Sequence, residues 1–556
     1  MTETMITNPI LPGFNPDPSI CRVGDDYYIA TSTFEWYPGV QIHHSRDLAH
    51  WTLVAHPLDR GDLLDMRGNP DSCGIWAPCL THADGLFWLI YTDVKRLSGS
   101  FKDAPNYLTT APTINGPWSK RVYLNASGFD PSLFHAPDGR KYLVNMLWDH
   151  RQQGHGDQFA GIVLQEYDVA AEKLTGPIHN IFQGTERKLT EAPHLYYREG
   201  WYYLMTAEGG TGYEHAVTLA RSRSLLGPYE VHPDKHVLTT AFAPDVPLQR
   251  CGHADIVETQ AGETYMVHLC SRPLTVSDTT GQSAIRRDLP GSDQIQRRSP
   301  LGRETAIQKM EWRDDGWLYL AEGGQAPKTI HTTSPNGLKA EETVVEPVRT
   351  NFAPGPLPIA FQWLRSPEPA RLFSLAANPG SLRIYGRLSP GNFFESAMLA
   401  RRQTALSYRA ATRIDFSPRD FQSFAGLICW YNQCQYHYLS VTREDDGSRA
   451  LRIMSALGDF PFGRSVFGCD PVRVPEEGPL DLAVEVDGPA LQFFWLNGDN
   501  GWQMIGPVLD ATILSDEAGV GEGNNFTGAF VGMAAHDISG QAQHADFAWF
   551  DYETRG

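Results

Sequence analysis

Three carboxylic side chains stand at related positions in a repeated phrase of this sequence. The phrase is a short polar-to-apolar run followed by a turn and an aromatic strand, and its copies begin roughly sixty residues apart. Asp17 and Asp130 directly precede a proline in the first and third copies, and Glu191 stands one residue earlier in the fourth. Carboxylates brought together repel one another and shift one another's pKa values, so they are costly to keep for structure alone. Their position in the repeat therefore predicts a catalytic site.

The repeat also predicts the elements that bring these side chains together. Its five copies begin at Asp17, Ala77, Asp130, Ala192 and, more loosely, Ala254. Each copy leads through a turn into an apolar strand, which fits the four-stranded blades of a propeller better than a helical solenoid. The innermost strand of every blade lines the central channel, so equivalent positions on different blades face one another. We therefore expect the three carboxylates to be neighbours in space.

A second β-rich region follows the repeats. The last blade is completed at residues 304–312, and the chain from about 321 to 358 is rich in Gly, Pro, Thr and charge, as is typical of a surface connector. Later runs such as 409–416 and 425–431 resemble strands of an antiparallel sandwich. We predict an all-β chain with a propeller at 1–320, a linker at 321–358 and a C-terminal β-sandwich at 359–556.

Composition narrows the classes of partner. The 556 residues carry a formal net charge of −19, which disfavours nucleic acid and anionic membranes and suits a neutral ligand such as a sugar. Apolar runs long enough for a membrane span are absent, and residues 1–12 show no secretory signal. The eight cysteines have no CxxC or zinc-site spacing. Reduced thiols in a cytoplasmic protein are the favoured interpretation over a disulfide framework.

Four ordered motifs make this chain similar to a known family. They are NPDPS at 15–19, GFDPS at 128–132, TEAPH at 190–194 and PLGRET at 300–305. In this order they resemble glycoside hydrolase family 43, and the likeness to its two-domain β-xylosidases runs through both predicted domains. The segments 34–39, 74–78 and 251–254 resemble that subgroup too. One departure is Ala192, where the resemblance leads us to expect glycine.

The resemblance implies a five-bladed propeller, an appended jelly-roll or lectin-like sandwich, and inverting hydrolysis of a terminal β-D-xylosyl or α-L-arabinofuranosyl bond. Such hydrolysis needs a carboxylate that activates water and a protonated carboxyl that donates to the leaving oxygen, about 6.5–9.5 Å apart. By resemblance, Asp17 is the general base, Glu191 the general acid, and Asp130 the residue that orients Glu191 and keeps its pKa high. The alternative for Asp17 and Asp130 is turn capping before proline.

The resemblance also indicates which residues hold the sugar. Arg303 is expected to bind adjacent hydroxyls with its guanidinium, whereas a surface ion pair with Glu304 is the alternative. Phe34, Trp76 and Trp148 are expected to offer aromatic faces to the sugar ring, although a core position is an equal alternative for Trp148.

Three further substrate contacts are expected from the same resemblance. His253 falls on the fifth inner strand, near the terminal sugar or a water-coordinated cation, and a purely structural role is its alternative. Thr211 is a weaker candidate. Phe526, in the loop 524–528, is expected to enter the mouth of the site and form the leaving-group subsite, against an equal alternative of buried core. A blocked mouth favours short oligosaccharides over polymers.

These expectations define one favoured function and two alternatives. The favoured one is an exo-acting glycosidase that releases D-xylose from the non-reducing end of β-1,4-xylooligosaccharides, with α-L-arabinofuranosides as a second substrate class left open. The alternatives are an enzyme of the same architecture with other specificity, such as an arabinan-directed hydrolase or a retaining fructosyl-transferring relative, and a non-catalytic carbohydrate-binding propeller.

No cofactor is expected to be required, and a divalent cation such as Ca²⁺ near the channel is left open because the family includes members with a bound ion. The expected partners are a small oligosaccharide and further copies of the chain in a dimer or tetramer.

Overall fold

The computed structural model describes residues 4–152, 158–276, 296–333, 348–518 and 525–555. Within these ranges the regular elements are β-strands and five short 3-10 turns. The chain divides into two compact units. Unit 1 comprises Met1–Leu64, Cys73–Arg272 and Arg303–Val344, and unit 2 comprises Asp65–Ser72, Pro273–Gly302 and Val345–Gly556.

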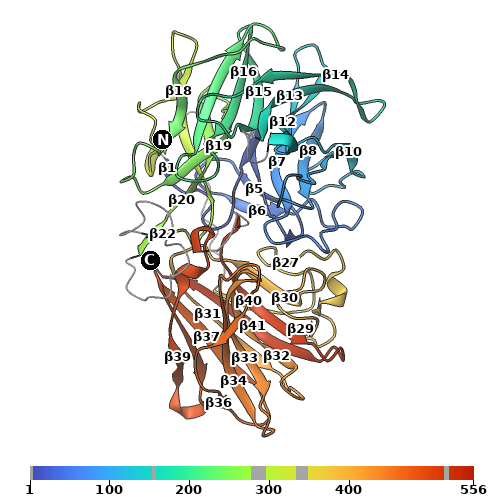
Figure 1. Cartoon of the computed structure of the whole chain (residues 1–556), viewed down its shortest axis with the longest axis vertical. Helices are drawn as coiled ribbons and strands as arrows, with labels where there is room; N and C mark the ends of the chain where they lie inside the picture. Colours follow the sequence, from blue (N-terminus) through green and yellow to red (C-terminus); the bar gives the residue numbers. More distant parts are fainter. Residues whose placement is uncertain (1–3, 153–157, 277–295, 334–347, 519–524, 556) are drawn as a thin grey trace. The chain divides into compact units, whose positions relative to one another are not determined.

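Unit 1 contains five antiparallel sheets of four strands each, which are the blades of a propeller (Figure 1). The strands of each blade are given from the inner strand outward. The first blade contains β2 (Ser19–Val23), β3 (Asp26–Thr31), β5 (Gln41–Ser45) and β6 (Thr52–Ala55), and the second contains β7 (Gly74–Ala83), β8 (Leu86–Val94), β9 (Asn106–Ala111) and β10 (Val122–Asn125). The third contains β11 (Ser132–His135), β12 (Lys141–Trp148), β13 (Phe159–Asp168) and β14 (Lys173–Phe182), the fourth contains β15 (Glu191–Arg198), β16 (Trp201–Glu208), β17 (Ala216–Ser222) and β18 (Glu230–Thr239), and the fifth contains β19 (Gln249–Glu258), β20 (Thr264–Ser271), β23 (Glu304–Trp312) and β24 (Leu318–Leu320).

The inner strands contact one another in the order β2, β7, β11, β15 and β19, and β19 contacts β2 again, which closes the ring. The second strands of the blades are buried almost throughout, because blades pack face to face. Such strands are continuous apolar runs instead of alternating ones. One interblade cluster joins Cys79 and Ile90 of the second blade to Leu133 and Leu143 of the third. The predicted five-bladed propeller is confirmed.

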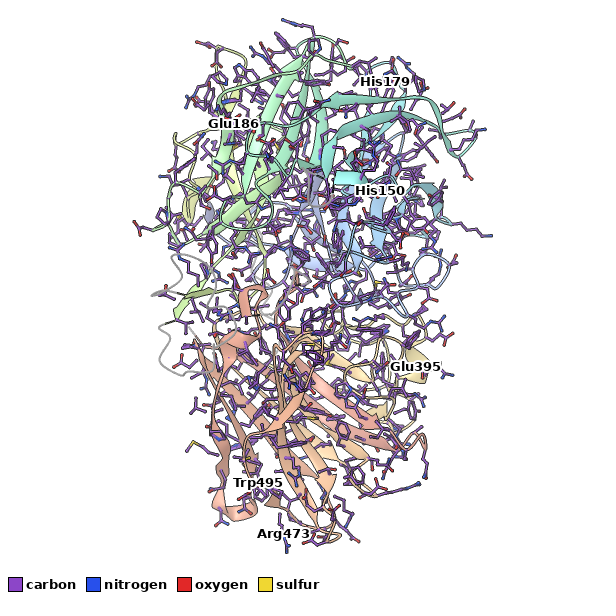
Figure 2. The ribbon with its side chains drawn as sticks, viewed as in Figure 1. His150, His179, Glu186, Glu395, Arg473 and Trp495 are labelled. Carbon is purple, nitrogen blue, oxygen red and sulfur yellow. The ribbon has the colours of Figure 1, made fainter. Side chains whose placement is uncertain are left out.

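Polar side chains lie on the outer strands and connecting turns, such as His179 on β14 and His150 in the turn η1 (His150–Gln152) (Figure 2). The described residues contain no helix of the length and hydropathy that a membrane crossing requires. All eight cysteines lie in the described ranges, and each is a free thiol.

Unit 2 is built on two antiparallel sheets (Figure 1). One contains, in spatial order, β28 (Phe373–Ser374), β29 (Leu382–Tyr385), β41 (His544–Thr554), β31 (Ser407–Asp415), β37 (Leu480–Asp487), β38 (Ala490–Leu496) and β39 (Trp502–Asp510), with β26 (Arg349–Asn351) paired to β41. The other contains β30 (Met398–Arg402), β40 (Phe530–Asp537), β32 (Ser423–Asn432), β33 (Gln435–Arg443), β34 (Arg449–Leu457) and β35 (Ser465–Phe467), with β36 (Val472–Arg473) paired to β34. The predicted C-terminal sandwich is confirmed.

The segment predicted as a linker contributes short strands at both ends. β25 (Ile330–Thr333) pairs with β1 (Thr4–Thr7) in unit 1, and β26 extends a sheet of unit 2. Through these pairings the segment 321–358, whose sequence shows little periodicity, satisfies part of its backbone hydrogen bonding.

Candidate active site

One residue in or just before each inner strand has a left-handed backbone. In the first four blades it is the residue at which the repeated phrase begins, whereas in the fifth it is His253, one residue before the predicted start at Ala254. The φ angles are 57° at Asp17, 37° at Ala77, 53° at Asp130, 51° at Ala192 and 42° at His253. A left-handed backbone costs a residue with a Cβ roughly 1–2 kcal/mol, so these five residues add backbone strain at the channel. Asp17 and Asp130 stand at this position of the phrase, and Glu191 directly precedes it.

Asp17 is held at the channel by two side-chain donors. Its Oδ1 accepts a hydrogen bond of 2.9 Å from Arg303 Nη1, and its Oδ2 accepts one of 2.7 Å from Ser32 Oγ. Ser32 Oγ in turn accepts the backbone N–H of Ala77, at 2.7 Å, from the next blade. Asp17 is 5% exposed, and its side chain bonds to Ser32 and Arg303 instead of capping its own turn, as the alternative required. The carboxylate is therefore fixed in position with its charge compensated.

Asp130 and Glu191 lie together in the third and fourth blades. Asp130 Oδ2 accepts the N–H of Ala192, the residue after Glu191, at 3.2 Å. Burial raises the pKa of Asp130 well above its usual value, and the negative charges of Glu191 and Asp17 raise it further. Burial, followed by the charge of Asp17, raises the pKa of Glu191 to about 8. A carboxyl with this pKa holds its proton at neutral pH, which is what a general acid requires.

Arg303 is a buried residue of the channel. It is 3% exposed, and its guanidinium lies 5.3 Å from the ring centroid of Phe34 in addition to its bond to Asp17. Glu304, its alternative partner, instead accepts two hydrogen bonds from Arg272, at 2.7 and 2.8 Å. Arg303 is thus the cation that faces the group of carboxylates.

Aromatic rings form a continuous wall beside the carboxylates. Phe34 lies 5.7 Å from Trp76, Trp76 lies 5.4 Å from Phe129, and Phe129 lies 6.2 Å from Trp148, all between ring centroids. The three aromatic residues expected at the site are therefore linked by a fourth, Phe129, which precedes Asp130. The sequence motif contained Phe129, but nothing in its pattern separated it from a core residue.

Lys102 is a residue of this wall that the sequence did not indicate. Its Nζ lies 4.5 Å from the ring centroid of Trp148 and 6.0 Å from those of Trp76 and Phe129. Burial lowers the pKa of Lys102, and its positive charge in turn lowers the pKa of Glu191. Lys102 lies outside the repeated phrase, so no periodic signal marks it.

Comparisons with known proteins identify the family. The sequence profile of "Glycosyl hydrolases family 43" matches residues 6–318, and that of "Beta xylosidase C-terminal Concanavalin A-like domain" matches residues 349–553. The chain belongs to glycosyl hydrolase family 43. The family membership expected from the ordered motifs is confirmed.

Several family 43 relatives match over nearly their whole length. The chain is 54% identical to xylosidase/arabinosidase 43B of Humicola insolens over 549 residues, which cover 98% of this chain and 97% of that protein. It is 48% identical to a β-xylosidase of Bacillus subtilis (strain 168), over 99% of this chain and 100% of that protein. The crystal structure of a xylan β-1,4-xylosidase from Bacillus halodurans C-125 aligns with a TM-score of 0.91 at 46% identity, over 99% of this chain and 100% of that one.

In this family 43 chain, His253 lies beside Asp17 in the channel. His253 Nδ1 is 3.7 Å from Asp17 Oδ1, and burial lowers the pKa of His253 to about 4, so the imidazole is neutral at pH 7. Thr211 is half-buried, and its carbonyl accepts a 2.8 Å hydrogen bond from Arg250 Nε. The contacts of Thr211 thus involve its backbone, and its expected role toward substrate stays a prediction.

Phe526 belongs to unit 2. It is half-buried, and its backbone N–H donates a 3.0 Å hydrogen bond to Ser72 Oγ of the same unit. Asn524, at the start of the predicted loop, lies outside the described residues. The expected role of Phe526 at the leaving-group subsite stays a prediction.

The described residues do not form a cluster of metal-binding side chains. Across the described ranges, no group of three or more His, Cys, Asp or Glu side chains could hold a metal ion. The residues present therefore do not fit an ion held by several such side chains, and the expected cation stays a prediction without ligands.

Proposed function

We propose that this chain is an exo-acting, inverting β-xylosidase that releases D-xylose from the non-reducing end of β-1,4-xylooligosaccharides. The observation that carries the proposal is the difference between two buried carboxyl groups of one channel. Glu191 has its pKa raised to about 8, whereas Asp17 receives hydrogen bonds from Arg303 and Ser32. Environments that separate the protonation states of two carboxyl groups define an acid and a base.

The proposed reaction uses one proton transfer at each carboxyl group. Asp17 takes a proton from water as the water oxygen attacks the anomeric carbon, and Glu191 gives its proton to the departing glycosidic oxygen. The products are xylose of inverted anomeric configuration and a shortened oligosaccharide. Asp17 is then protonated and Glu191 ionised, and exchange with solvent restores both. Asp130, through the N–H of Ala192, fixes the backbone that carries Glu191.

The proposed sugar site is formed by the aromatic wall and Arg303. Aromatic faces pack on the apolar side of a pyranose, and the guanidinium of Arg303 binds hydroxyl groups of the sugar. Identity of 54% and 48% to proteins named xylosidase/arabinosidase and β-xylosidase supports xylose as the released sugar. The first of these names also supports α-L-arabinofuranosides as a second substrate class.

The same proposal assigns the leaving-group subsite to Phe526, which favours xylobiose-sized substrates over xylan. Assembly into a dimer or tetramer and a cytoplasmic location remain predictions from the sequence. A binding protein without turnover is the less favoured function, because a lectin has no use for a carboxyl group whose pKa is raised to about 8 beside a second, compensated carboxylate.

The test compares hydrolysis of an aryl β-D-xyloside with that of an aryl α-L-arabinofuranoside, for the wild type and for Asp17→Ala. We expect both activities to be lost in the variant, because one site serves both sugars. Asp138→Ala, in an exposed turn of the third blade, is the matched control and should retain both. NMR of the first product should show the α-anomer of xylose. Retention of either activity by Asp17→Ala, release of the β-anomer, or faster release of internal fragments from xylan than of xylose from xylobiose would contradict the proposal.

A further inference from the structure

A second cavity lies farther along the same channel. Its volume is about 440 Å³, and it is lined by residues of all five inner strands, including Ile20, Thr81, Phe134, Tyr197 and Ile256. Sites for small molecules typically have volumes of about 300–1,000 Å³ and mostly apolar walls with a few polar groups. The cavity has the size and the mixed lining of such a site.

The cavity is separate from the group of three carboxylates, but the same inner strands carry both. Ile20 lies three residues after Asp17, and His194 lies three residues after Glu191 on the strand that forms the wall of both sites. None of the three carboxylates lines the cavity. A ligand in it would therefore occupy a second position on the propeller and leave the active site accessible.

The one acidic side chain of the lining, Asp255, has its acceptor oxygens occupied by donors of the protein. Asp255 is compensated by four donors: Ser19 Oγ and the Ile20 N–H on Oδ2, and Tyr196 Oη and the Ile256 N–H on Oδ1, at 2.7 to 2.9 Å. Burial lowers the pKa of His135 to about 4, so it is neutral at pH 7. The lining contains no lysine or arginine. The lining thus offers no cation to an anionic ligand, and the oxygens of Asp255 are already hydrogen-bonded, which favours an uncharged ligand.

His194 provides hydrogen-bonding capacity that its surroundings do not use. Its ring is 8% exposed, and its Nδ1 lies 3.8 Å from Asp255 Oδ1, beyond hydrogen-bond distance. Within the described ranges the nearest acceptor to His194 Nδ1 is thus beyond hydrogen-bond distance, and His194 lines the cavity. The ring nitrogens of His194 can therefore bind a ligand hydroxyl that enters the cavity.

An aromatic platform stands across the lining. Tyr197 is 46% exposed, and its ring is held 4.9 Å from that of Tyr202, which itself lies 6.1 Å from the ring of Phe134. Exposed aromatic faces beside hydrogen-bonding groups such as His194 and Thr81 match a molecule that has C–H faces and hydroxyl edges.

We propose that this cavity is a second carbohydrate site, which binds one neutral monosaccharide of the pentose class. The identity of the sugar as D-xylose rests on the proposed function, because the active site would release that sugar into the same propeller. The chemistry of the lining, by contrast, does not depend on turnover.

The experiment is a ligand-observed NMR titration of the full chain with D-xylose in an Arg303→Ala background, which weakens sugar binding at the active site. We expect saturable binding to persist in that background. Adding Tyr197→Ala should weaken it by about tenfold, through loss of the aromatic platform, and adding Ile256→Trp should abolish it by filling the cavity. Tyr123→Ala, an exposed tyrosine on the outer strand β10, is the matched control and should bind as the background does. Inorganic phosphate should not compete.

Two results would overturn the second site: absence of saturable D-xylose binding in Arg303→Ala, or equal binding with and without Tyr197→Ala. Tyr197→Ala is a surface change, so it keeps the test decisive if Ile256→Trp perturbs folding, as thermal unfolding would reveal. Xyloside hydrolysis by the Tyr197→Ala single variant should equal that of the wild type. A wild type without turnover would contradict the proposed function, while the titration would still decide the second site.

Discussion

The propeller channel and the core of the sandwich both bury charged side chains, and they compensate the charge differently. In the sandwich, Arg449 is fully buried, and its guanidinium donates to the carbonyls of Pro475, Gly478 and Phe416 at 2.7 to 2.9 Å. In the channel, three buried carboxyl groups face one arginine, Arg303. Backbone carbonyls bind the first charge, whereas the second group has an excess of carboxyl groups over cations.

This difference teaches which buried charges indicate chemistry. A cation among carbonyl oxygens remains charged and ties three segments together, which is a structural role. Carboxyl groups in excess over cations must bind protons to relieve their repulsion, which creates an acid at neutral pH. Burial alone does not separate the two cases, but the balance of charge does.

The largest expected effect tests the acid directly. Glu191→Gln should lower kcat/KM for xylobiose by about 10²–10⁴-fold, because the amide cannot protonate the leaving oxygen. The loss should be smaller for an aryl xyloside with an acidic phenol, which leaves without assistance. Glu199→Gln, in an exposed turn of the same blade, is the control and should be unchanged. Equal losses on both substrates would remove Glu191 from the role of acid.

The two buried arginines should respond in opposite ways. Arg449→Ala should lower the free energy of unfolding by about 2–4 kcal/mol, because three buried carbonyls lose their donor, while kcat/KM of the folded protein stays the same. Arg303→Lys should keep the charge and most of the stability but lower kcat/KM by about 10²-fold, because the fork of donors is lost. Denaturant unfolding and steady-state kinetics measure the two effects. The comparison fails if both variants lose mainly stability.

The pH profile should show the raised pKa of Glu191. Since kcat/KM requires the protonated acid, it should fall as pH rises through about 8. The free energy of unfolding should also fall as pH rises. The unfolded chain releases the Glu191 proton near the ordinary pKa of 4.5, whereas the folded protein keeps it up to about pH 8. The contribution of Glu191 to stability therefore declines between these two pH values.

Lys102→Met should move the alkaline limb to higher pH, because the lysine charge lowers the pKa of Glu191. Lys120→Met, at an exposed position, is the matched control and should not move it. Profiles of kcat/KM against pH for the three proteins decide the point. A limb that shifts to lower pH in Lys102→Met would contradict the assignment.

The smallest expected effect concerns backbone strain in the channel. Ala192 has a φ of 51°, and Ala192→Gly should stabilise the protein by about 1 kcal/mol because glycine accepts this conformation without a Cβ clash. Ala254→Gly, at a position of ordinary φ, should instead destabilise it by about 0.5–1 kcal/mol. Thermal unfolding measures both. Equal destabilisation would show that the turn at Ala192 is not strained.

Several features of the site could be predicted before any coordinates. The repeated phrase placed Asp17 and Asp130 at equivalent positions and Glu191 one residue earlier, and the family resemblance of the ordered motifs added Arg303 and the aromatic residues. Lys102 could not be predicted, because it lies outside the phrase and lone lysines are usually solvated. The contribution of Phe129 to the wall was equally hidden, since an aromatic residue in a β-rich chain is most often core.

The repeat, the strand-like runs and the family resemblance of the ordered motifs were sufficient to predict the two β architectures, because these signals lie in local sequence. The protonation of Glu191, the pairing of Arg303 with Asp17 rather than with its neighbour Glu304, and the cavity beyond them required the folded chain. The reason is physical: desolvation and Coulomb interactions depend on distances between blades, and residues hundreds of positions apart in sequence set those distances only after the ring has closed.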